Sequence, residues 1–297
     1  MINSAVLRVA FPAAVAAISL SACGGGAPAN LPAATAYVAA AAHAESWLYT
    51  QGIGPSGTGV YAYRFPQGKV VRKVAGYFGP LWMCVDGKGD LFLVNLGIFE
   101  YRPGGSALIK TLKDRFSPGD CAVDASSGDL AVSNTSRHGA SVAIYKHAAG
   151  LPAYYTDPDL KYIRSLAFDE RGDLFVDGYK KGQATFAELQ RGANRFVAID
   201  VSPAIAQPAE IRWDGSDLAV GIARSNLIRR VAISNGRGHV VGTTRLDQCR
   251  YTDFVLLPGS VAAACGDVRV FAYPQGGAPI EVVRYLLPGA IVIAIGK

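Results

Sequence analysis

This sequence lacks the motifs by which many enzymes and nucleic-acid-binding proteins are recognised. It has only four histidines and contains no His-Glu-x-x-His pair, no Gly-x-Ser-x-Gly elbow and no phosphate-binding loop. Charged residues make up 18% of the chain, and the basic ones stand singly or in pairs although the net charge is +6. Because nucleic-acid surfaces usually need clustered Lys and Arg, we expect no nucleic-acid partner.

Residues suited to long helices are also scarce after position 45. Short runs rich in Val, Ile, Tyr, Phe and Leu alternate with many of the 34 glycines. Such runs are typical of β-strands. A chain of 297 residues, half of them apolar, is long enough for one large all-β domain or two ordinary ones.

Residues 1–22 have the pattern of a signal peptide. Arg8 supplies a positive charge, and the apolar segment from Val9 to Leu20 is too short to span a bilayer. The letters LSAC at 20–23 match the lipobox of bacterial lipoproteins at every position. This resemblance implies that Cys23 becomes a lipid-modified N-terminus. The alternative is an ordinary secretory signal followed by an incidental cysteine.

Residues 23–45 are rich in Gly, Ala and Pro, which predicts a flexible tether between a membrane and a folded domain. Gly24 and Gly25 follow Cys23 at positions where lipoproteins held at the inner membrane often carry Asp. We therefore expect the chain to be anchored to a membrane of the bacterial cell envelope through its N-terminal lipid. The periplasmic side or the outer-membrane surface is the expected location.

One turn motif recurs along the rest of the chain. It reads VDGKGDLF at 85–92, VDASSGDL at 123–130, FDERGDLF at 168–175 and WDGSDL at 213–218. The Asp-Leu pairs are separated by 39, 44 and 44 residues. Each copy joins two apolar runs, and Asp and Gly accept the turn geometry of a hairpin. We attribute the repeated Asp86, Asp124, Asp169 and Asp214 to this turn rather than to chemistry.

A second motif lies between these turns and ends in glycine. Its six copies place glycines at 68, 104, 150, 192, 236 and 276. Two hairpin turns in each repeat of about 43 residues predict four strands per repeat, which is one blade of a β-propeller. The six copies predict a six-bladed propeller over 46–297.

The two ends of the chain complete this ring. The first blade lacks its opening strand, since residues 46–50 lead straight into the strand around Val60. The apolar run at 290–295 has no partner of its own. We expect it to form the innermost strand of the first blade, which closes the ring and removes an exposed sheet edge.

Setting Cys23 aside leaves four cysteines, and an even number is expected of an exported protein with disulfides. Cys84 and Cys121 lie on the expected innermost strands of neighbouring blades. Cys249 and Cys265 flank one hairpin. The natural pairing is therefore 84–121 and 249–265, with two pairs of free thiols as the alternative.

Propellers bind ligands at the mouth of the central channel, where the innermost strands begin. Counting four residues back from each turn aspartate gives Trp82, Asp120, Ser165 and Glu210, and the last blade places Asp253 at this level. Two arginines also lie near this rim. The candidate binding residues are Trp82, Asp120, Arg164, Glu210, Arg212 and Asp253. Asp120, Glu210 and Asp253 could hold a divalent cation, or such residues could line the channel and pair with the arginines.

The pattern of an apolar run followed by Val-Asp-x-x-Gly-Asp-Leu-aromatic-Val resembles NHL-repeat and SMP-30/gluconolactonase-like propellers, both six-bladed. The resemblance covers most of 46–297. NHL domains are mainly interaction surfaces, whereas gluconolactonase-like members are calcium-dependent lactonases that use Glu, Asn and Asp at the channel mouth. Glu210 and Asp253 match two of these ligands, but Asn95 and Asn134 fall on second strands.

Two functional hypotheses follow. The first is a monomeric, lipid-anchored binding module without cofactor, whose ligand is a protein, a glycan or a small molecule. The alternative is a calcium-dependent lactonase or esterase with its site at the channel mouth.

Overall fold

The computed structural model describes residues 46–54, 56–75, 82–136, 139–157, 160–251, 253–283 and 292–296. The expected signal peptide, Cys23 and the tether lie outside these residues. In the described part of the chain the regular elements are strands and two short 3-10 turns, η1 (Pro103–Gly105) and η2 (Lys146–Ala148). No helix in these ranges is long and apolar enough to cross a membrane.

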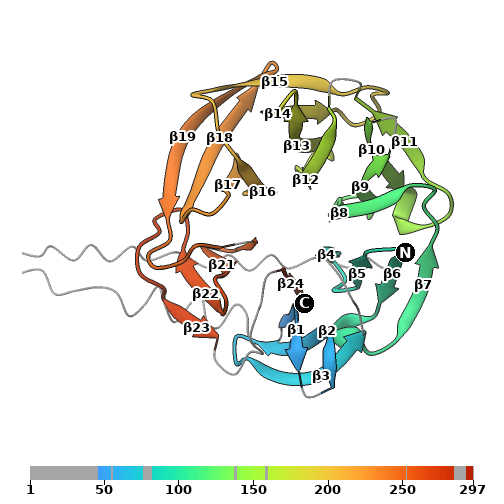
Figure 1. Ribbon diagram of the computed structural model, residues 1–297, viewed down its shortest axis with the longest axis vertical. Coiled ribbons are helices and arrows are strands. Elements are labelled where there is room, and N and C mark those ends of the chain that lie inside the picture. The colour runs from blue at the N-terminus through green and yellow to red at the C-terminus, as the bar shows by residue number, and fades with distance from the viewer. Residues whose placement is uncertain are drawn as a thin grey trace, which may run out of the picture.

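The strands form four-stranded meanders that follow one another around a ring (Figure 1). Blade 1 contains β24 (Ile293–Gly296), β1 (Ser46–Gly54), β2 (Gly57–Phe65) and β3 (Lys69–Ala75). Blade 2 contains β4 (Trp82–Val85), β5 (Leu91–Val94), β6 (Ile98–Tyr101) and β7 (Leu108–Leu112). Blade 3 contains β8 (Ser117–Val123), β9 (Leu130–Ser136), β10 (Gly139–Tyr145) and β11 (Ala153–Thr156).

The second half of the ring continues the same order. Blade 4 contains β12 (Tyr162–Phe168), β13 (Leu174–Lys180), β14 (Gln183–Leu189) and β15 (Val197–Ser202). Blade 5 contains β16 (Pro208–Trp213), β17 (Leu218–Ile222), β18 (Leu227–Ser234) and β19 (Arg237–Arg245). Blade 6 contains β20 (Phe254–Leu257), β21 (Ser260–Ala264), β22 (Val268–Ala272) and β23 (Glu281–Val283).

Blades 4 and 5 are joined into one eight-stranded sheet. Their outer strands β15 and β19 pair in parallel, with Asp200 opposite Arg237 and Ser202 opposite His239. Hydrogen bonding therefore gives four four-stranded sheets and one eight-stranded sheet. Counting each meander as a blade gives six. The pairing also covers two strand edges that would otherwise face solvent.

The hydrophobic core has the same sixfold division. The buried apolar side chains form six clusters, and each cluster draws its members from two consecutive blades. In one of them Tyr61 and Phe65 of blade 1 pack with Val268 and Val270 of blade 6. Because every blade buries both faces against neighbours, the apolar residues of the short strands become the stabilising contacts of the ring.

Both turn motifs form as the sequence predicts. Each turn aspartate accepts backbone N–H groups of its own turn, as Asp169 Oδ1 does from Arg171 (2.9 Å) and Asp173 (2.8 Å). The six glycines of the second motif all have φ between +69° and +80°. This backbone strongly favours glycine, and at Gly276 a Cβ would lie 2.3 Å from the carbonyl oxygen of Arg245.

The final strand closes the ring as expected. β24 pairs antiparallel with β1, with Trp47 opposite Gly296 and Thr50 opposite Ile293. It is the innermost strand of blade 1 (Figure 1). The β-propeller fold and its closure are therefore confirmed.

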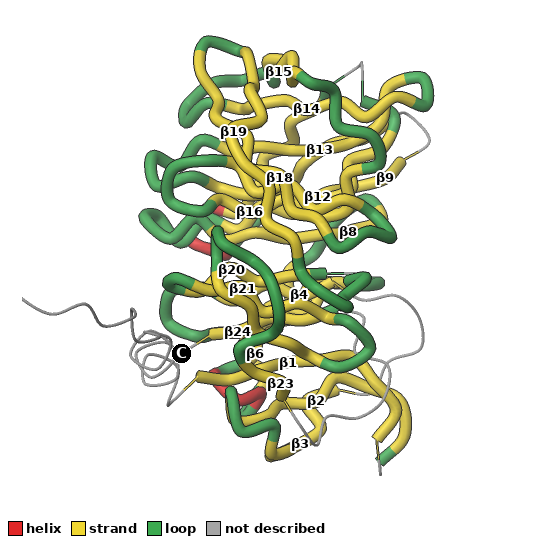
Figure 2. The backbone as a smooth tube through the Cα atoms, turned by 90° about the vertical axis from the view of Figure 1, so that its left-hand side faces the viewer, coloured by secondary structure: helices red, strands yellow, loops and turns green. Residues whose placement is uncertain are grey.

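The strands cross the thickness of the ring, and the loops gather at its two faces (Figure 2). We call the face at which the innermost strands begin the mouth face. The opposite face, which carries the hairpin turns of Asp86, Asp124, Asp169 and Asp214, is the turn face.

Candidate functional site

The candidate residues lie where the innermost strands begin. Trp82 starts β4, and Asp120, Arg164 and Glu210 lie in β8, β12 and β16. Asp253 directly precedes β20. Asp120, Glu210 and Asp253 are 3%, 8% and 5% exposed, so three carboxyl groups are buried around the channel.

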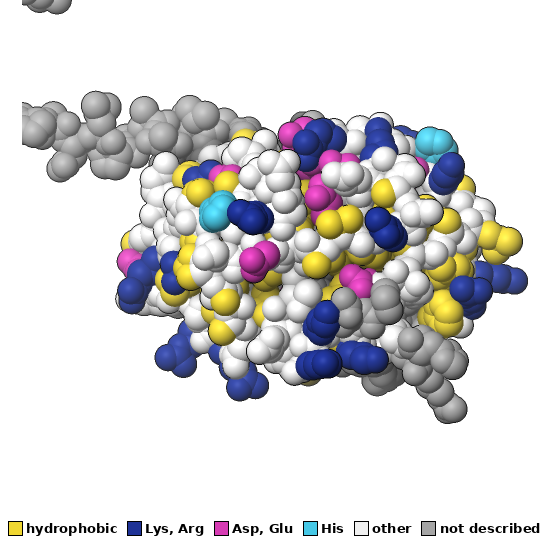
Figure 3. Space-filling view, turned by 90° about the horizontal axis from the view of Figure 1, so that it is seen from above, with side chains coloured by type: hydrophobic (Ala, Val, Ile, Leu, Met, Phe, Trp, Pro, Cys, Tyr) yellow, Lys and Arg dark blue, Asp and Glu magenta, His cyan; other side chains and the backbone are white. Residues whose placement is uncertain are grey.

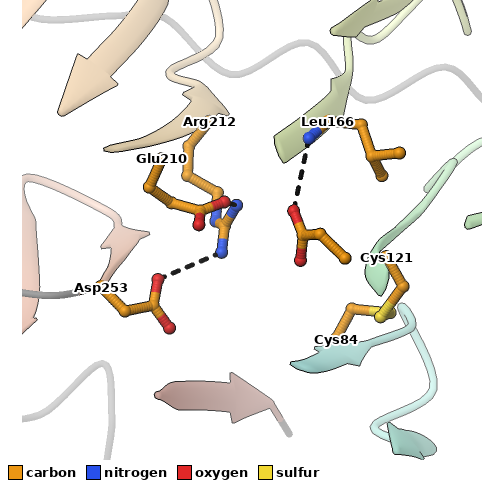
Figure 4. The surroundings of a disulfide bond; sticks show 7 residues. Cys84, Cys121, Leu166, Glu210, Arg212 and Asp253 are labelled. Atoms are coloured by element: carbon orange, nitrogen blue, oxygen red, sulfur yellow. Dashed lines mark hydrogen bonds and ion pairs between the residues drawn. A yellow bond between two sulfur atoms is a disulfide. The ribbon is translucent and has the colours of Figure 1, made fainter. Parts of the chain in front are cut away.

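Arg212 supplies the positive charge of this group (Figure 4). One guanidinium nitrogen, Nη1, pairs with Glu210 Oε1, and Nη2 lies 3.4 Å from Asp253 Oδ1. The Ser165 hydroxyl donates a further hydrogen bond to Glu210 Oε1. We call Arg212, Glu210 and Asp253 the interior cluster. The guanidinium thus lies between two carboxylates from neighbouring blades.

The pKa values of this region follow from burial. Burial raises the pKa of Asp120 well above its usual range, and the nearby Glu210 carboxylate raises it further. Burial and the same carboxylate raise the pKa of Asp253 to about 7. Burial alone would lower the pKa of Arg212, but Glu210 and Asp253 outweigh it and raise this pKa. Arg212 therefore stays charged inside the ring.

Three of the inward-facing side chains also join consecutive blades. Asp120 Oδ2 accepts the N–H of Leu166 (3.3 Å), Ser165 Oγ accepts that of Ile211 (3.1 Å), and Asp253 Oδ2 accepts that of Ile293 (2.9 Å). Each bond runs from one innermost strand region to the innermost strand of the next blade. These groups therefore hold the ring together, because buried backbone N–H groups need partners.

Between blades 2 and 3 the equivalent position is Trp82, which has no acceptor to offer. There the innermost strands are joined covalently by the Cys84–Cys121 disulfide, with a Cα–Cα distance of 5.8 Å (Figure 4). The second disulfide joins Cys249 and Cys265, with a Cα–Cα distance of 5.2 Å. The predicted pairing is confirmed. Two disulfides indicate a location outside the reducing cytoplasm.

The carboxyl groups do not form a metal-binding set. Across the ranges that the structure describes, no group of three or more His, Cys, Asp or Glu side chains could hold a metal ion. Glu210 and Asp253 contact the Arg212 guanidinium, and Asp120 binds a backbone N–H. Glu210 and Asp253 thus pair with Arg212, whereas Asp120 and Arg164 form no ion pair in the described ranges.

A cavity of about 800 Å³ at the mouth face lies between blades 4, 5 and 6. Arg164 of β12, Tyr179 of β13, Arg224 after β17 and Arg250 before β20 line it. We call Arg164, Arg224 and Arg250 the mouth arginines. The cavity lining contains no Asp or Glu among the described residues.

None of the mouth arginines forms an ion pair with a carboxylate in the described ranges. Arg164 is positioned by a hydrogen bond from Nε to the carbonyl oxygen of Ala209 (2.7 Å). Arg224 and Arg250 are exposed. The cavity therefore presents three positive charges that nothing in its described lining neutralises.

Asp177 is buried in the neighbourhood of Arg164. Neither of its carboxyl oxygens has a hydrogen-bond partner in the described structure. Burial raises the pKa of Asp177 to about 8, repulsion from Glu210 adds to the rise, and attraction to Arg164 opposes it. At neutral pH this carboxyl group is therefore mostly uncharged and does not neutralise Arg164.

Two other cavities of the ring are lined by candidate residues. One of about 200 Å³ at the mouth face is lined by Trp82, Leu96, Asp120 and Tyr162 of blades 2 to 4. Another of about 450 Å³ lies toward the turn face and has mostly apolar walls, such as Val123 and Trp213, with Arg212 at its edge. The candidate residues are thus divided among different surroundings instead of forming one site.

Arg224, Arg250 and Tyr179 line this cavity but are not among the residues predicted from the sequence. Arg224 lies in the turn between the second and third strands of blade 5, and Gly182 of the same cavity lies in that turn of blade 4. In a meander this turn returns to the face at which the first strand began. Counting along each blade to its second turn would therefore have placed Arg224 at the mouth face.

Several solved structures share this architecture. A chain of the nidogen/laminin complex matches with a TM-score of 0.65 and 11% identity over 85% of this chain and 98% of its own. A protein of unknown function from Bacteroides caccae matches with a TM-score of 0.63 and 10% identity, over 85% of this chain and 99% of its own. The β-propeller domain of Cps50 (Swd1) from Myceliophteria thermophila matches with a TM-score of 0.57 and 10% identity, over 80% of this chain and 84% of its own. The shared fold is the β-propeller.

No family model and no curated protein sequence matches the chain. At these identities the structural matches show the fold alone. On the side of the ring drawn in Figure 3, Lys and Arg side chains are spread among apolar and uncharged ones. Function is therefore argued from the mouth face itself.

Proposed function

We propose that this protein is an exported, lipid-anchored β-propeller that binds a ligand at its mouth face without catalysing a reaction. Cys23 carries the lipid, and residues 23–45 connect it to the ring. The anchored protein stands at a membrane of the bacterial cell envelope, on its periplasmic side or at the outer-membrane surface.

The observation that supports a binding role is a contrast between two regions. The charged side chains inside the ring pair with one another, whereas the arginines of the mouth cavity have no carboxylate partner among the described residues. The interior cluster pairs its charges internally, since the Arg212 guanidinium lies between Glu210 and Asp253. Cavities lie at the mouth face beside Arg164 and beside Trp82, and this face also carries Leu96, which is 97% exposed. Concave sites with apolar walls and a few polar groups are where propellers and other folds bind ligands.

The structural match to a chain of the nidogen/laminin complex supports a role in binding. That protein forms a complex with another protein, and its ring is similar in fold to this one. The absence of a metal-binding set among the described residues gives no support to the calcium-dependent alternative.

The chain offers a matched pair of exposed leucines for testing this proposal. Leu96 lies in the β5–β6 turn beside a mouth cavity, and Leu151, 86% exposed, lies in the β10–β11 connection at the turn face. The full chain in detergent is presented to arrays of envelope glycans and purified envelope proteins. We expect Leu96→Asp to weaken binding of the ligand found, because it changes the surface of the mouth face, and Leu151→Asp to leave binding unchanged. Equal loss from both variants, or loss from Leu151→Asp alone, would contradict a mouth-face site.

Anchoring is tested separately. Cells expressing the full chain are labelled with radioactive palmitate and fractionated. We expect label and membrane association for the wild type, and neither for Cys23→Ser. Membrane association of Cys23→Ser equal to that of the wild type would rule out the lipid anchor.

A further inference from the structure

The mouth arginines bring three positive charges to one cavity. Three guanidinium groups line one cavity, and arginine remains charged under all physiological conditions. Like charges that line one cavity repel one another. Surface arginines elsewhere in the ring, such as Arg171 and Arg191, pair with a turn aspartate. Arg237 is exposed and has no ion pair in the described ranges either, so the distinguishing feature of this cavity is that three unpaired arginines line it together.

The backbone holds one of these arginines in an unfavourable conformation. Arg224 has φ of +58°, and Gln207, on the adjoining segment of the same blade, has φ of +54°. The two segments are joined by the hydrogen bond from Ala223 N to Gln207 O (2.9 Å). A non-glycine residue with this backbone costs free energy, and such residues are enriched at binding sites.

We infer that the cavity lined by Arg164, Arg224 and Arg250 binds the oxyanion groups of an acidic oligosaccharide. This inference rests on the proposed function and names the class of ligand that the mouth face takes. Guanidinium groups bind carboxylate and phosphate oxygens through paired N–H donors. Three arginines from three blades can engage more than one oxyanion along a chain of sugars.

The remaining lining fits the neutral part of such a ligand. A volume of about 800 Å³ lies within the range of sites that enclose drug-sized ligands. Tyr179 offers a half-buried aromatic ring, and Gln207 an exposed amide, at the same cavity. Aromatic faces and amides are suited to the apolar faces and hydroxyl groups of sugars.

Isothermal titration calorimetry of the full chain in detergent tests the inference. The probes are tri-galacturonic acid, inorganic phosphate and the neutral trisaccharide maltotriose. We expect tri-galacturonic acid or phosphate to bind and maltotriose to bind at least about tenfold more weakly than the acidic probe. Comparison of the two acidic probes distinguishes a carboxylated sugar from a phosphorylated one.

Variants place the binding in this cavity. Arg224→Gly removes one guanidinium, and glycine readily adopts the positive φ of this position. Arg250→Ala removes a second guanidinium. Each should weaken binding of the acidic probe at least about tenfold. Arg237→Ala is the matched control, because it removes one exposed arginine at the start of β19, outside the cavity. It should leave the affinity unchanged.

Three results would overturn the inference. They are no binding of either acidic probe, equal weakening by Arg237→Ala, or binding of maltotriose as tight as that of the acidic trisaccharide. The last result would leave the proposed mouth-face function standing with a neutral ligand. Failure of the proposed function appears in the Leu96→Asp and Leu151→Asp comparison, which does not depend on these probes.

Discussion

The interior cluster and the mouth arginines place the same side chain in opposite situations. Arg212 lies between Glu210 and Asp253 and has 21% of its side chain exposed. Arg164, Arg224 and Arg250 line a cavity without a described carboxylate. A partly buried arginine destabilises the fold if it loses its carboxylate partners. An unpaired arginine at a surface can instead bind the anionic group of a ligand. The residues of the interior cluster thus stabilise the ring, whereas we propose that the mouth arginines bind its ligand.

Replacing Arg212 should have the largest effect. Arg212→Met leaves Glu210 and Asp253 buried without their cation, which we expect to cost about 3–5 kcal/mol of unfolding free energy. Urea unfolding of the full chain in detergent measures this loss. A loss below about 1 kcal/mol would mean that the interior cluster does not stabilise the ring.

Opening the Cys84–Cys121 disulfide should have the next largest effect. The double variant Cys84→Ser, Cys121→Ser removes the covalent link between β4 and β8, which we expect to cost about 2–4 kcal/mol. Thermal unfolding under non-reducing conditions measures it. The affinity of the mouth face for its acidic probe should stay unchanged, and a loss of affinity equal to that of Arg250→Ala would show that the two regions are coupled.

Asp177 makes the interior sensitive to pH. Unfolded Asp releases its proton near pH 4, whereas the pKa of folded Asp177 is about 8. Between these values the native state keeps a proton that the unfolded state has lost, so stability falls as the pH rises from 4 to 8. Asp177→Asn cannot titrate, and it should be more stable than the wild type at pH 8 by roughly 2 kcal/mol or more.

Unfolding free energies at several pH values between 4.5 and 8.5 test this. Asp200→Asn, at an exposed position of β15, is the control, and its unfolding free energy should change with pH as that of the wild type does. An unchanged slope in Asp177→Asn would show that Asp177 is not the group responsible.

The smallest effect on stability is expected at the mouth. Arg224→Gly removes an unpaired charge from a backbone with φ of +58°, so unfolding free energy should change by less than about 0.5 kcal/mol or rise slightly. Urea unfolding beside Arg212→Met gives the contrast directly. A destabilisation by Arg224→Gly as large as that by Arg212→Met would remove the distinction between the two regions.

Much of the fold follows from the sequence, because turns impose strict local demands. The recurrent Asp of the first turn and the Gly of the second mark the hairpins, and the unpartnered final strand indicates how the ring closes. The two cysteine pairs follow from the same strand order. The pairing of β15 with β19 does not follow, since it depends on how far two outer strands extend toward each other.

The site was less predictable. Counting back from the turn aspartates finds positions on the innermost strands, and the structure has Asp120 in β8 and Glu210 in β16. It cannot tell that Arg212 pairs with Glu210 while Arg164 stays unpaired, because both are arginines near the same rim. Only the three-dimensional arrangement of partners separates them.

Hydrogen–deuterium exchange of the full chain, with and without saturating tri-galacturonic acid, tests the central claim most directly. Slower exchange is predicted in the mouth-face segments 205–208, 223–226 and 248–251, with no change in the turn-face segments 86–90, 124–129 and 214–217. An arginine-lined ligand site at the mouth would be contradicted if exchange slowed only at the turn face. It would also be contradicted if exchange slowed nowhere at a ligand concentration that calorimetry shows to be saturating.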